Sequence, residues 1–217
     1  MKEVSIADNQ FATCLAPIEK YYGEKIREHG AIPKGVDWNG EESQQLRFEQ
    51  LLRVCPHDTA FSLLDYGCGY GSLYDAMKKK FQHFTYHGLD ISEDMIDAAR
   101  KNYEQAGNAS FDVGMQPKGT IDYIVASGVF NVRLETTDDA WWAYLLNTLE
   151  LMNRFSDKGF AFNCLTKYSD KERMRDYLYY ADPCRLFDYC KTYFSKNVAL
   201  LHDYGLYEFT ILVRKDI

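Results

Sequence analysis

The chain has 217 residues, of which 25 are Lys or Arg and 32 are Asp or Glu, so its formal net charge at pH 7 is −7. This length fits one domain, or one domain with a small appendage, and is enough to bury a sizeable core. The acidic balance disfavours a nucleic-acid partner and an anionic membrane surface. No window approaches the roughly 18 consecutive apolar residues that a membrane span needs.

The cysteines and histidines give no sign of a metal site. The six cysteines contain no C-x-x-C pair, which argues against zinc-ribbon and thioredoxin-type sites. The first ten residues lack the apolar stretch of a secretory signal. We therefore expect a cytoplasmic protein with reduced thiols and no bound metal.

The first part of the chain has the pattern of helices. Residues 18–29 mix apolar and charged positions as an amphipathic helix does, and residues 41–54 repeat that pattern. Pro56 ends the second helix, because a proline disfavours helical geometry at the residue before it. We expect residues 1–57 to form an N-terminal helical cap.

From residue 58 to residue 217 the pattern changes to short apolar runs that alternate with amphipathic segments. Such alternation is typical of an α/β domain. Strands are expected over residues 61–66, 84–89, 109–113, 121–126, 159–165, 197–201 and 207–213, and helices over residues 72–81, 93–105 and 138–155 and, broken at Pro183, within residues 171–194.

The lengths of the connections predict the direction of the strands. Strands that are joined through helices require crossover connections, which make a mainly parallel sheet with helices on both faces. Only about five residues separate the last two strands, too few for a crossover, so these two strands must form an antiparallel hairpin. We expect an α/β fold with seven strands, mostly parallel, whose last strand is antiparallel.

A glycine-rich turn lies between the first strand and the helix that follows it. Residues 65–71 read D-Y-G-C-G-Y-G. Glycine permits a positive φ and a close approach of the backbone to a ligand, and the helix N-terminus offers free N–H groups. Asp90 ends the next strand, where a carboxylate can accept two hydrogen bonds from a ribose diol. The third glycine is Gly71, one place earlier than in the G-x-G-x-x-G dinucleotide fingerprint, which would have it at Ser72.

An acidic residue followed by G-x-G-x-G resembles motif I of the class I S-adenosylmethionine (SAM)-dependent methyltransferases. At the level of the fold, the resemblance covers about residues 58–217. It implies a Rossmann-like sheet of seven strands with an antiparallel last strand, in agreement with the hairpin expected from the loop length. It also implies an enzyme that transfers a methyl group from SAM.

The resemblance assigns roles to individual residues. The glycines of the turn would hold the methionine moiety of SAM, and Asp65 would orient the turn and lie near the ammonium group. Asp90 would bind the ribose hydroxyls, and the backbone at Ser127 would meet the amino end. The implied cofactor-binding residues are Asp65, Gly67, Cys68, Gly69, Gly71, Asp90, Ile91 and Ser127.

The adenine end departs from the family pattern. The resemblance implies that Ile91 packs on the adenine ring. The family often has an acidic or amide residue near the adenine amino group after the third strand, where this chain has Met115. The contact is left open between backbone N–H groups and Gln116.

The substrate is expected to be a small polar metabolite or a sugar derivative, methylated on oxygen. Residues 35–39, 43–48 and 201–210 resemble segments of bacterial methyltransferases found among surface-glycan and capsule biosynthesis enzymes. Ligands of open α/β sheets bind outside the carboxyl ends of the strands. From that edge and from the cap, where an Arg beside an aromatic ring suits an anionic group, we expect these substrate contacts: Trp38, Arg47, Asn131, Tyr168 and Tyr204. Arg47 has an equally good interpretation as an exposed helix residue.

A hydroxyl acceptor needs a group that takes its proton. His202 is the histidine expected at the carboxyl edge of the sheet, and its near-neutral pKa suits a general base. Asp203 can orient the substrate or act as the base itself. The competing interpretation of His202, a residue that caps the hairpin turn, is the more common case for such a position.

Other functions stay open at this point. A nicotinamide-dependent oxidoreductase begins with the same strand, turn and helix, although Ser72 and the terminal hairpin count against it. A SAM-binding protein without catalytic turnover would retain the same turn and Asp90. A DNA methyltransferase is disfavoured, because residues 126–131 lack an N-P-P-Y-type sequence. The sequence does not define the oligomeric state.

Overall fold

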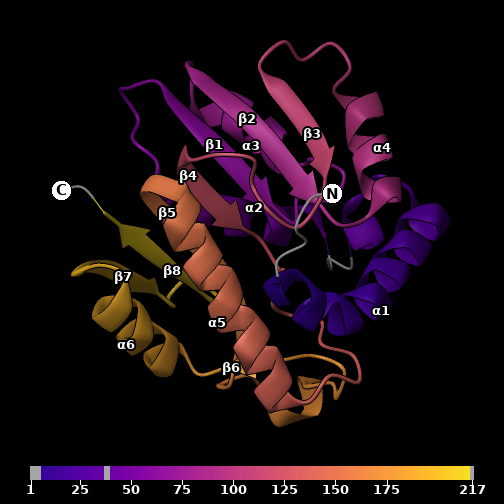
Figure 1. Ribbon diagram of the computed structural model, residues 1–217, viewed down its shortest axis with the longest axis vertical. Coiled ribbons are helices and arrows are strands. Elements are labelled where there is room, and N and C mark those ends of the chain that lie inside the picture. The colour runs from indigo at the N-terminus through magenta and orange to yellow at the C-terminus, as the bar shows by residue number, and fades with distance from the viewer. Residues whose placement is uncertain (1–5, 37–39, 216–217) are drawn as a thin grey trace.

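The protein is described by a computed structural model over residues 6–36 and 40–215. Trp38, expected to contact substrate, lies outside the described residues. One sheet with helices on both sides forms the centre of the molecule (Figure 1). Its eight strands are β1 (Phe61–Tyr66), β2 (Phe84–Asp90), β3 (Ala109–Val113), β4 (Ile121–Ala126), β5 (Ser156–Thr166), β6 (Tyr180–Ala181), β7 (Asn197–Leu201) and β8 (Glu208–Arg214).

The strand order is β3-β2-β1-β4-β5-β8-β7, and the two-residue β6 pairs with β5. β1 to β5 run parallel to one another, whereas β8 is antiparallel to both β5 and β7. The predicted mostly parallel sheet with an antiparallel last strand is therefore confirmed. The short β6 is an addition that the sequence pattern did not predict.

The helices are α1 (Ile6–His29), α2 (Glu41–Leu51), α3 (Leu73–Lys80), α4 (Glu93–Asn102), α5 (Asp138–Phe155) and α6 (Pro183–Tyr193), with short 3-10 helices at η1 (Pro33–Val36), η2 (Leu52–Val54) and η3 (Lys171–Arg173). α1, α5 and α6 share one hydrophobic cluster with the sheet, and α2, α3 and α4 share another. Among the described helices, none is both long and apolar enough to cross a membrane.

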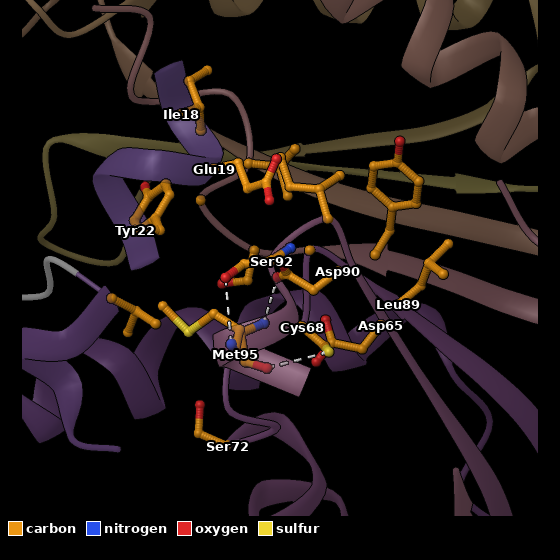
Figure 2. A pocket seen from close by; sticks show the side chains of 18 of the residues that line it. Ile18, Glu19, Tyr22, Asp65, Cys68, Ser72, Leu89, Asp90, Ser92 and Met95 are labelled. Atoms are coloured by element: carbon orange, nitrogen blue, oxygen red, sulfur yellow. Dashed lines mark hydrogen bonds between the residues drawn. The ribbon is translucent and has the colours of Figure 1, made fainter. Parts of the chain in front are cut away.

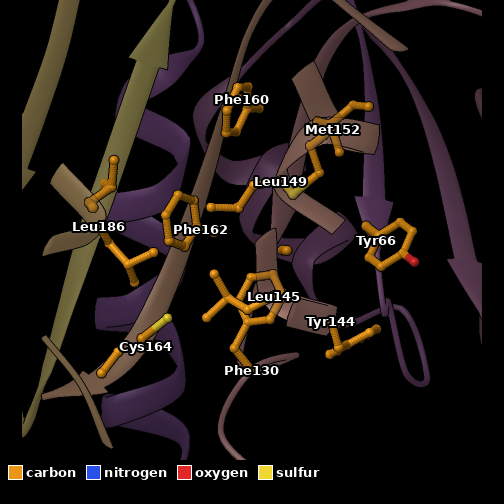
Figure 3. Packing of buried hydrophobic residues seen from close by; sticks show 14 of the residues in the cluster. Tyr66, Phe130, Tyr144, Leu145, Leu149, Met152, Phe160, Phe162, Cys164 and Leu186 are labelled. Atoms are coloured by element: carbon orange, nitrogen blue, oxygen red, sulfur yellow. The ribbon is translucent and has the colours of Figure 1, made fainter. Parts of the chain in front are cut away.

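The alternation of side chains along the strands separates the two clusters. In β1, Leu64 and Tyr66 belong to the α5 side, whereas Leu63 belongs to the α3 side. Figure 3 shows the α5 side, where Phe160 and Phe162 of β5 lie beside Leu149 of the helix. Both phenylalanines are fully buried. Burying such a side chain stabilises the fold by about 1.5–3 kcal/mol.

Two of the expected segments differ strongly from the structure. α1 begins at Ile6, well before residue 18, and joins the core of the sheet through buried side chains such as Leu15. Within residues 171–194 only η3 and α6 are helical, and the segment between them contains a turn at residues 176–177 and the short β6. The physical reason is that Pro183 lies in the first turn of α6, where its missing N–H costs nothing, and Asp182 caps that turn.

The carboxyl ends of the parallel strands are covered by α1. Figure 1 shows α1 at the end of the sheet to which β2 and β3 point. Its second half packs against α4, where the Arg27 guanidinium forms an ion pair with the Asp94 carboxylate. The N-terminal helix is therefore placed over the edge of the sheet where α/β proteins bind their ligands.

Candidate active site

A cavity opens at the carboxyl ends of β1, β2 and β4. It encloses about 980 Å³ when the open space at its mouth is included. Its walls come from α1, η1, α2, the turn after β1, the end of β2 and the loop after β4. Figure 2 shows the side chains that line it.

The turn after β1 needs glycine for two reasons. Gly67 has a φ of 72°, a region that side chains rarely adopt, and a Cβ atom there would lie 2.5 Å from Cγ2 of Val129. The backbone N–H groups of Gly67 and Cys68 both donate to the Leu89 carbonyl, at 2.7 and 3.1 Å. The turn is therefore tied to β2 and packed closely against the loop after β4.

Asp90 is the polar centre of the cavity. Its Oδ2 accepts a hydrogen bond from the Gly69 N–H at 2.8 Å, and its Oδ1 accepts one from the Ser92 N–H at 2.9 Å. Burial raises the pKa of the Asp90 carboxyl, although these N–H groups act to lower it. A carboxylate has about four lone-pair sites, more than the Gly69, Ser92 and Ile91 N–H groups occupy, so it can still accept from a ligand hydroxyl.

Two further polar groups face the same cavity. The buried Asp65 carboxylate accepts a hydrogen bond from the Tyr86 hydroxyl at 2.7 Å, and burial raises the pKa of Asp65 to about 7. Ser127 lines the cavity with a buried Oγ that has no hydrogen-bond partner among the described residues. A buried polar group without a partner is costly, so this hydroxyl is suited to a ligand's polar atom.

The rest of the lining is largely apolar. Ile91 and Met95 line the cavity together with Asp90. The Cys68 side chain also lines the cavity, and burial keeps the pKa of its thiol well above the usual value. A flat apolar ring and a ribose diol would both find suitable surfaces here. The residues present thus fit a nucleoside that carries a charged amino-acid tail.

Two solved structures with the same fold contain SAM. Magnesium protoporphyrin IX methyltransferase (ChlM) from Synechocystis PCC 6803, crystallised with SAM, has 13% identity and a TM-score of 0.53 and is matched over 100% of this chain and 86% of its own. DhpI, in a complex with SAM and HEP, has 13% identity and a TM-score of 0.64 over 93% of this chain and 97% of its own. At this identity the likeness concerns the fold.

The sequence comparisons decide the family. Residues 64–153 match the family model of a methyltransferase domain. An inferred methyltransferase of Mycobacterium tuberculosis (strain ATCC 25618 / H37Rv), Rv1506c, is 52% identical over 164 residues, which are 76% of this chain and 99% of that protein. The chain is a class I, SAM-dependent methyltransferase. The nicotinamide-dependent alternative is therefore set aside.

Most of the residues expected to bind the cofactor line the methyltransferase's cavity, and one does not. Gly71 has a φ of 85°, and a Cβ atom there would lie 2.8 Å from the Tyr103 ring and 2.9 Å from the Phe111 ring. Its glycine is needed for packing at the back of the turn. The residues brought together at the cavity are Asp65, Gly67, Cys68, Gly69, Asp90, Ile91 and Ser127.

The sequence predicts an N-terminal helical cap, but not which residues of its first helix line the cavity. Ile18, Glu19 and Tyr22 line the cavity from this helix. Figure 2 shows them above Asp90 and Ser92, on the opposite side of the cavity. No motif marks these positions. The amphipathic pattern of residues 18–29 indicates a helix, but nothing local indicates that the helix closes the cavity.

Arg47 has a different environment from the one expected. Its side chain is 8% exposed and forms an ion pair with Glu208 of β8, whose side chain is 1% exposed. Nε of Arg47 lies 2.8 Å from both carboxylate oxygens of Glu208, and Nη2 lies 2.6 Å from Oε1. The guanidinium is therefore engaged within the fold, which corrects the interpretation of Arg47 as an exposed helix residue. Its contact with substrate stays a prediction.

Asn131 and Tyr204 are held by internal hydrogen bonds. Oδ1 of Asn131 accepts from the Leu165 N–H at 3.1 Å, which joins the loop after β4 to β5. The Tyr204 hydroxyl lies 3.0 Å from Oγ1 of Thr210. Burial raises the pKa of Tyr204 above its ordinary value. Their contact with substrate stays a prediction.

His202, Asp203 and Tyr168 lie at the carboxyl edge, as expected, but are exposed. The His202 ring is 6.0 Å from the Tyr168 ring, centroid to centroid, and 6.0 Å from the Phe209 ring. These residues are not part of the lining of the Asp90 cavity. The role of His202 or Asp203 as a base stays a prediction.

Proposed function

We propose that this methyltransferase holds SAM in the Asp90 cavity and methylates an oxygen of a small polar metabolite or sugar derivative, in surface polysaccharide or capsule modification. The observation that carries the proposal is the Asp90 carboxylate, which the N–H groups of Gly69 and Ser92 fix in place with lone pairs still available. The Ser127 hydroxyl, buried and without a partner among the described residues, supports the placement of a polar tail nearby.

Each part of the cavity has a proposed task. Asp90 binds the ribose hydroxyls, and Ile91 packs on the adenine. The turn at Gly67 and the Asp65 carboxylate hold the methionine moiety, and the loop at Ser127 meets its amino end. α1 covers the bound cofactor and keeps water away from the reacting atoms.

When bound, SAM supplies a methyl group on a sulfonium, which is already electrophilic. The protein's residues therefore have to align the acceptor with that methyl group and exclude water. A hydroxyl acceptor also releases a proton. We propose that His202 or Asp203, at the edge of the sheet beside Tyr168, takes this proton.

Thermal unfolding with SAM, S-adenosylhomocysteine (SAH), NAD and NADP, each in a parallel sample, tests the cofactor assignment. A ligand at about a hundred times its dissociation constant adds roughly 2.7 kcal/mol to the free energy of unfolding. We expect a higher melting temperature with SAM and SAH alone. A shift with NAD or NADP, or no shift with any of the four, would contradict the proposal.

Activity is tested with labelled SAM and a panel of hydroxyl-bearing metabolites and sugar derivatives. We expect the label to appear on an oxygen of one member of this panel. Binding of SAM without transfer to any hydroxyl, amine or carboxylate acceptor would instead favour a SAM-binding protein without turnover.

A further inference from the structure

A buried chain of hydrogen bonds connects α2 and β8 to the cavity wall in the loop after β4. At its centre is Asn163 of β5, which is fully buried. Its Oδ1 accepts from the Gly128 N–H at 2.8 Å, and its Nδ2 donates to Oε2 of Glu208 at 2.6 Å. Glu208 in turn accepts from Arg47 of α2. Four residues that are distant in the sequence thus form one relay, which we define as Arg47, Glu208, Asn163 and Gly128.

The relay ends at a part of the backbone that faces the ligand cavity. Gly128 lines the cavity between Ser127 and Val129, and its φ of 75° gives the loop a sharp turn. Val129 packs so closely on Gly67 that a Cβ atom on that glycine would lie 2.5 Å from its Cγ2. A shift of the Gly128 peptide would therefore move both the Ser127 hydroxyl and the turn after β1.

A contribution to stability alone does not explain the buried ion pair between Arg47 and Glu208. Removing two charges from water costs several kcal/mol per ion, and replacing a buried pair with apolar residues of similar size is often neutral or stabilising. Besides Arg47, Glu208 bonds Asn163, which passes the interaction to Gly128. The hydrogen bonds of the relay therefore hold one peptide of the cavity wall, that of Gly128, in place.

We propose that Arg47, Glu208 and Asn163 are positioning residues that fix the Gly128 peptide, and through it Ser127, for the amino-acid end of the cofactor. The inference rests on the proposed seat of SAM in the Asp90 cavity. The adenosine end lies by Asp90 and Ile91 in that proposal, away from Gly128. Disturbing the relay should therefore weaken ligands with an amino-acid tail and spare those without one.

The test compares the dissociation constants of SAH and adenosine, measured by calorimetry or by competition, in the wild type and in Asn163→Asp. The new carboxylate still accepts from the Gly128 N–H but replaces the donor to Glu208 with a like charge. We expect the affinity for SAH to fall at least tenfold and the affinity for adenosine to change less than twofold.

A second substitution should restore the relay. In Asn163→Asp combined with Glu208→Gln, the amide introduced at 208 donates to the carboxylate introduced at 163 and accepts from Arg47. The total charge of the relay is then that of the wild type. We expect SAH affinity to return to within about threefold of the wild type. If Asn163→Asp lowered the affinity through general damage to the fold, adding Glu208→Gln would not restore it.

Asn108→Asp is the matched control. Asn108 also donates through Nδ2, to the Phe84 carbonyl at 3.0 Å, and accepts through Oδ1, from the Tyr74 hydroxyl at 2.6 Å. It is not among the residues lining the Asp90 cavity. We expect this variant to bind SAH and adenosine with the same ratio of affinities as the wild type.

If Asn163→Asp does not fold, Arg47→Met combined with Glu208→Leu takes its place, because apolar replacement of a buried pair preserves stability. We expect a selective loss of SAH affinity there as well, of about fivefold. The inference is overturned if either variant folds and loses SAH and adenosine affinity equally, or loses neither. A wild type that binds neither ligand would instead contradict the proposed function itself.

Discussion

The carboxyl edge of the sheet has two halves that use their polar groups differently. Over β1, β2 and β4, the Asp90 carboxylate retains free lone pairs and the buried Ser127 hydroxyl has no partner among the described residues. Over β5, β7 and β8, Glu208 and its neighbours are bonded to one another, and Tyr168 and His202 are exposed. The first half is preformed for a ligand of fixed chemistry. In the second half the polar groups bond one another or are exposed, so they do not define the chemistry of the acceptor.

The largest effect in the cofactor half is expected from Asp65. Its pKa is raised to about 7 by burial, whereas the unfolded chain releases this proton near pH 3.9. Between these values the folded state holds the proton and the unfolded state does not, so the free energy of unfolding falls as pH rises from about 4 to about 7. Above that range the loss approaches about 4 kcal/mol.

Asp65→Asn removes this titration, so the free energy of unfolding of the variant should depend less on pH. Urea unfolding from pH 4 to pH 8 measures it, with Asp97→Asn on the exposed side of α4 as the control. We expect the stability advantage of Asp65→Asn over the wild type to grow with pH and to level off above pH 7. If the free energies of unfolding of the wild type and Asp65→Asn change with pH in parallel, burial does not raise the pKa of Asp65.

Asp90→Ala tests, through the affinity for SAH, whether the half of the edge over β1, β2 and β4 binds the cofactor. The variant loses an acceptor of two proposed hydrogen bonds from the ribose, and bonds to charged groups contribute about 1.5–3 kcal/mol each. We expect the SAH dissociation constant to rise at least a hundredfold, about 3 kcal/mol. Calorimetry with Asp112→Ala as the control measures this. A change within threefold would place the cofactor elsewhere.

Gly67→Ala tests the close approach of the two loops, with a smaller effect. A positive φ is unfavourable for Ala by about 1–2 kcal/mol, and the added Cβ meets Val129. We expect a stability loss of about 2 kcal/mol and an SAH affinity about tenfold lower. Gly107→Ala is the control, because a Cβ atom there meets nothing within 4 Å. Equal stabilities in denaturant would contradict the tight packing of this turn.

His202→Ala should have the smallest effect on the affinity for SAH. It therefore tests whether the two halves of the carboxyl edge have separate tasks. The ring is exposed and is not part of the cavity lining, so we expect the SAH dissociation constant to stay within about twofold. Turnover of the acceptor should fall about a hundredfold or more if His202 takes the proton. Full turnover in both His202→Ala and Asp203→Ala would discard the base proposed at this hairpin.

The same division explains what the sequence predicts. The bounds of β1, β3, β4, β7 and α5 agree with expectation. β1, β4 and β7 are short runs rich in apolar residues, and α5 is a long amphipathic stretch behind its capping residue Thr137. The residues proposed to bind the cofactor lie within a few positions of a strand end, so the local order of Asp65, Gly67 and Gly69 is enough to place them at the cavity. Asp90 follows from the next strand by the same rule.

Features that depend on distant contacts were not predictable in this way. Arg47 and Glu208 are 161 positions apart, and neither carries a local signal of the other. Glu19 lines the cavity because α1 folds back over the sheet, which no pattern within α1 indicates. Gly71 belongs to the motif but serves packing against Tyr103 and Phe111. Tertiary packing therefore decided these positions.

The central claim is that the Asp90 cavity holds the cofactor, and a crystal structure of the complex with SAH tests it most directly. We predict that the ribose hydroxyls lie within hydrogen-bonding distance of the Asp90 carboxylate, about 2.5–3.0 Å between oxygens, with the amino-acid tail beside Asp65 and Ser127. Density for SAH at any other place, with the Asp90 carboxylate free of the ribose, would contradict the account.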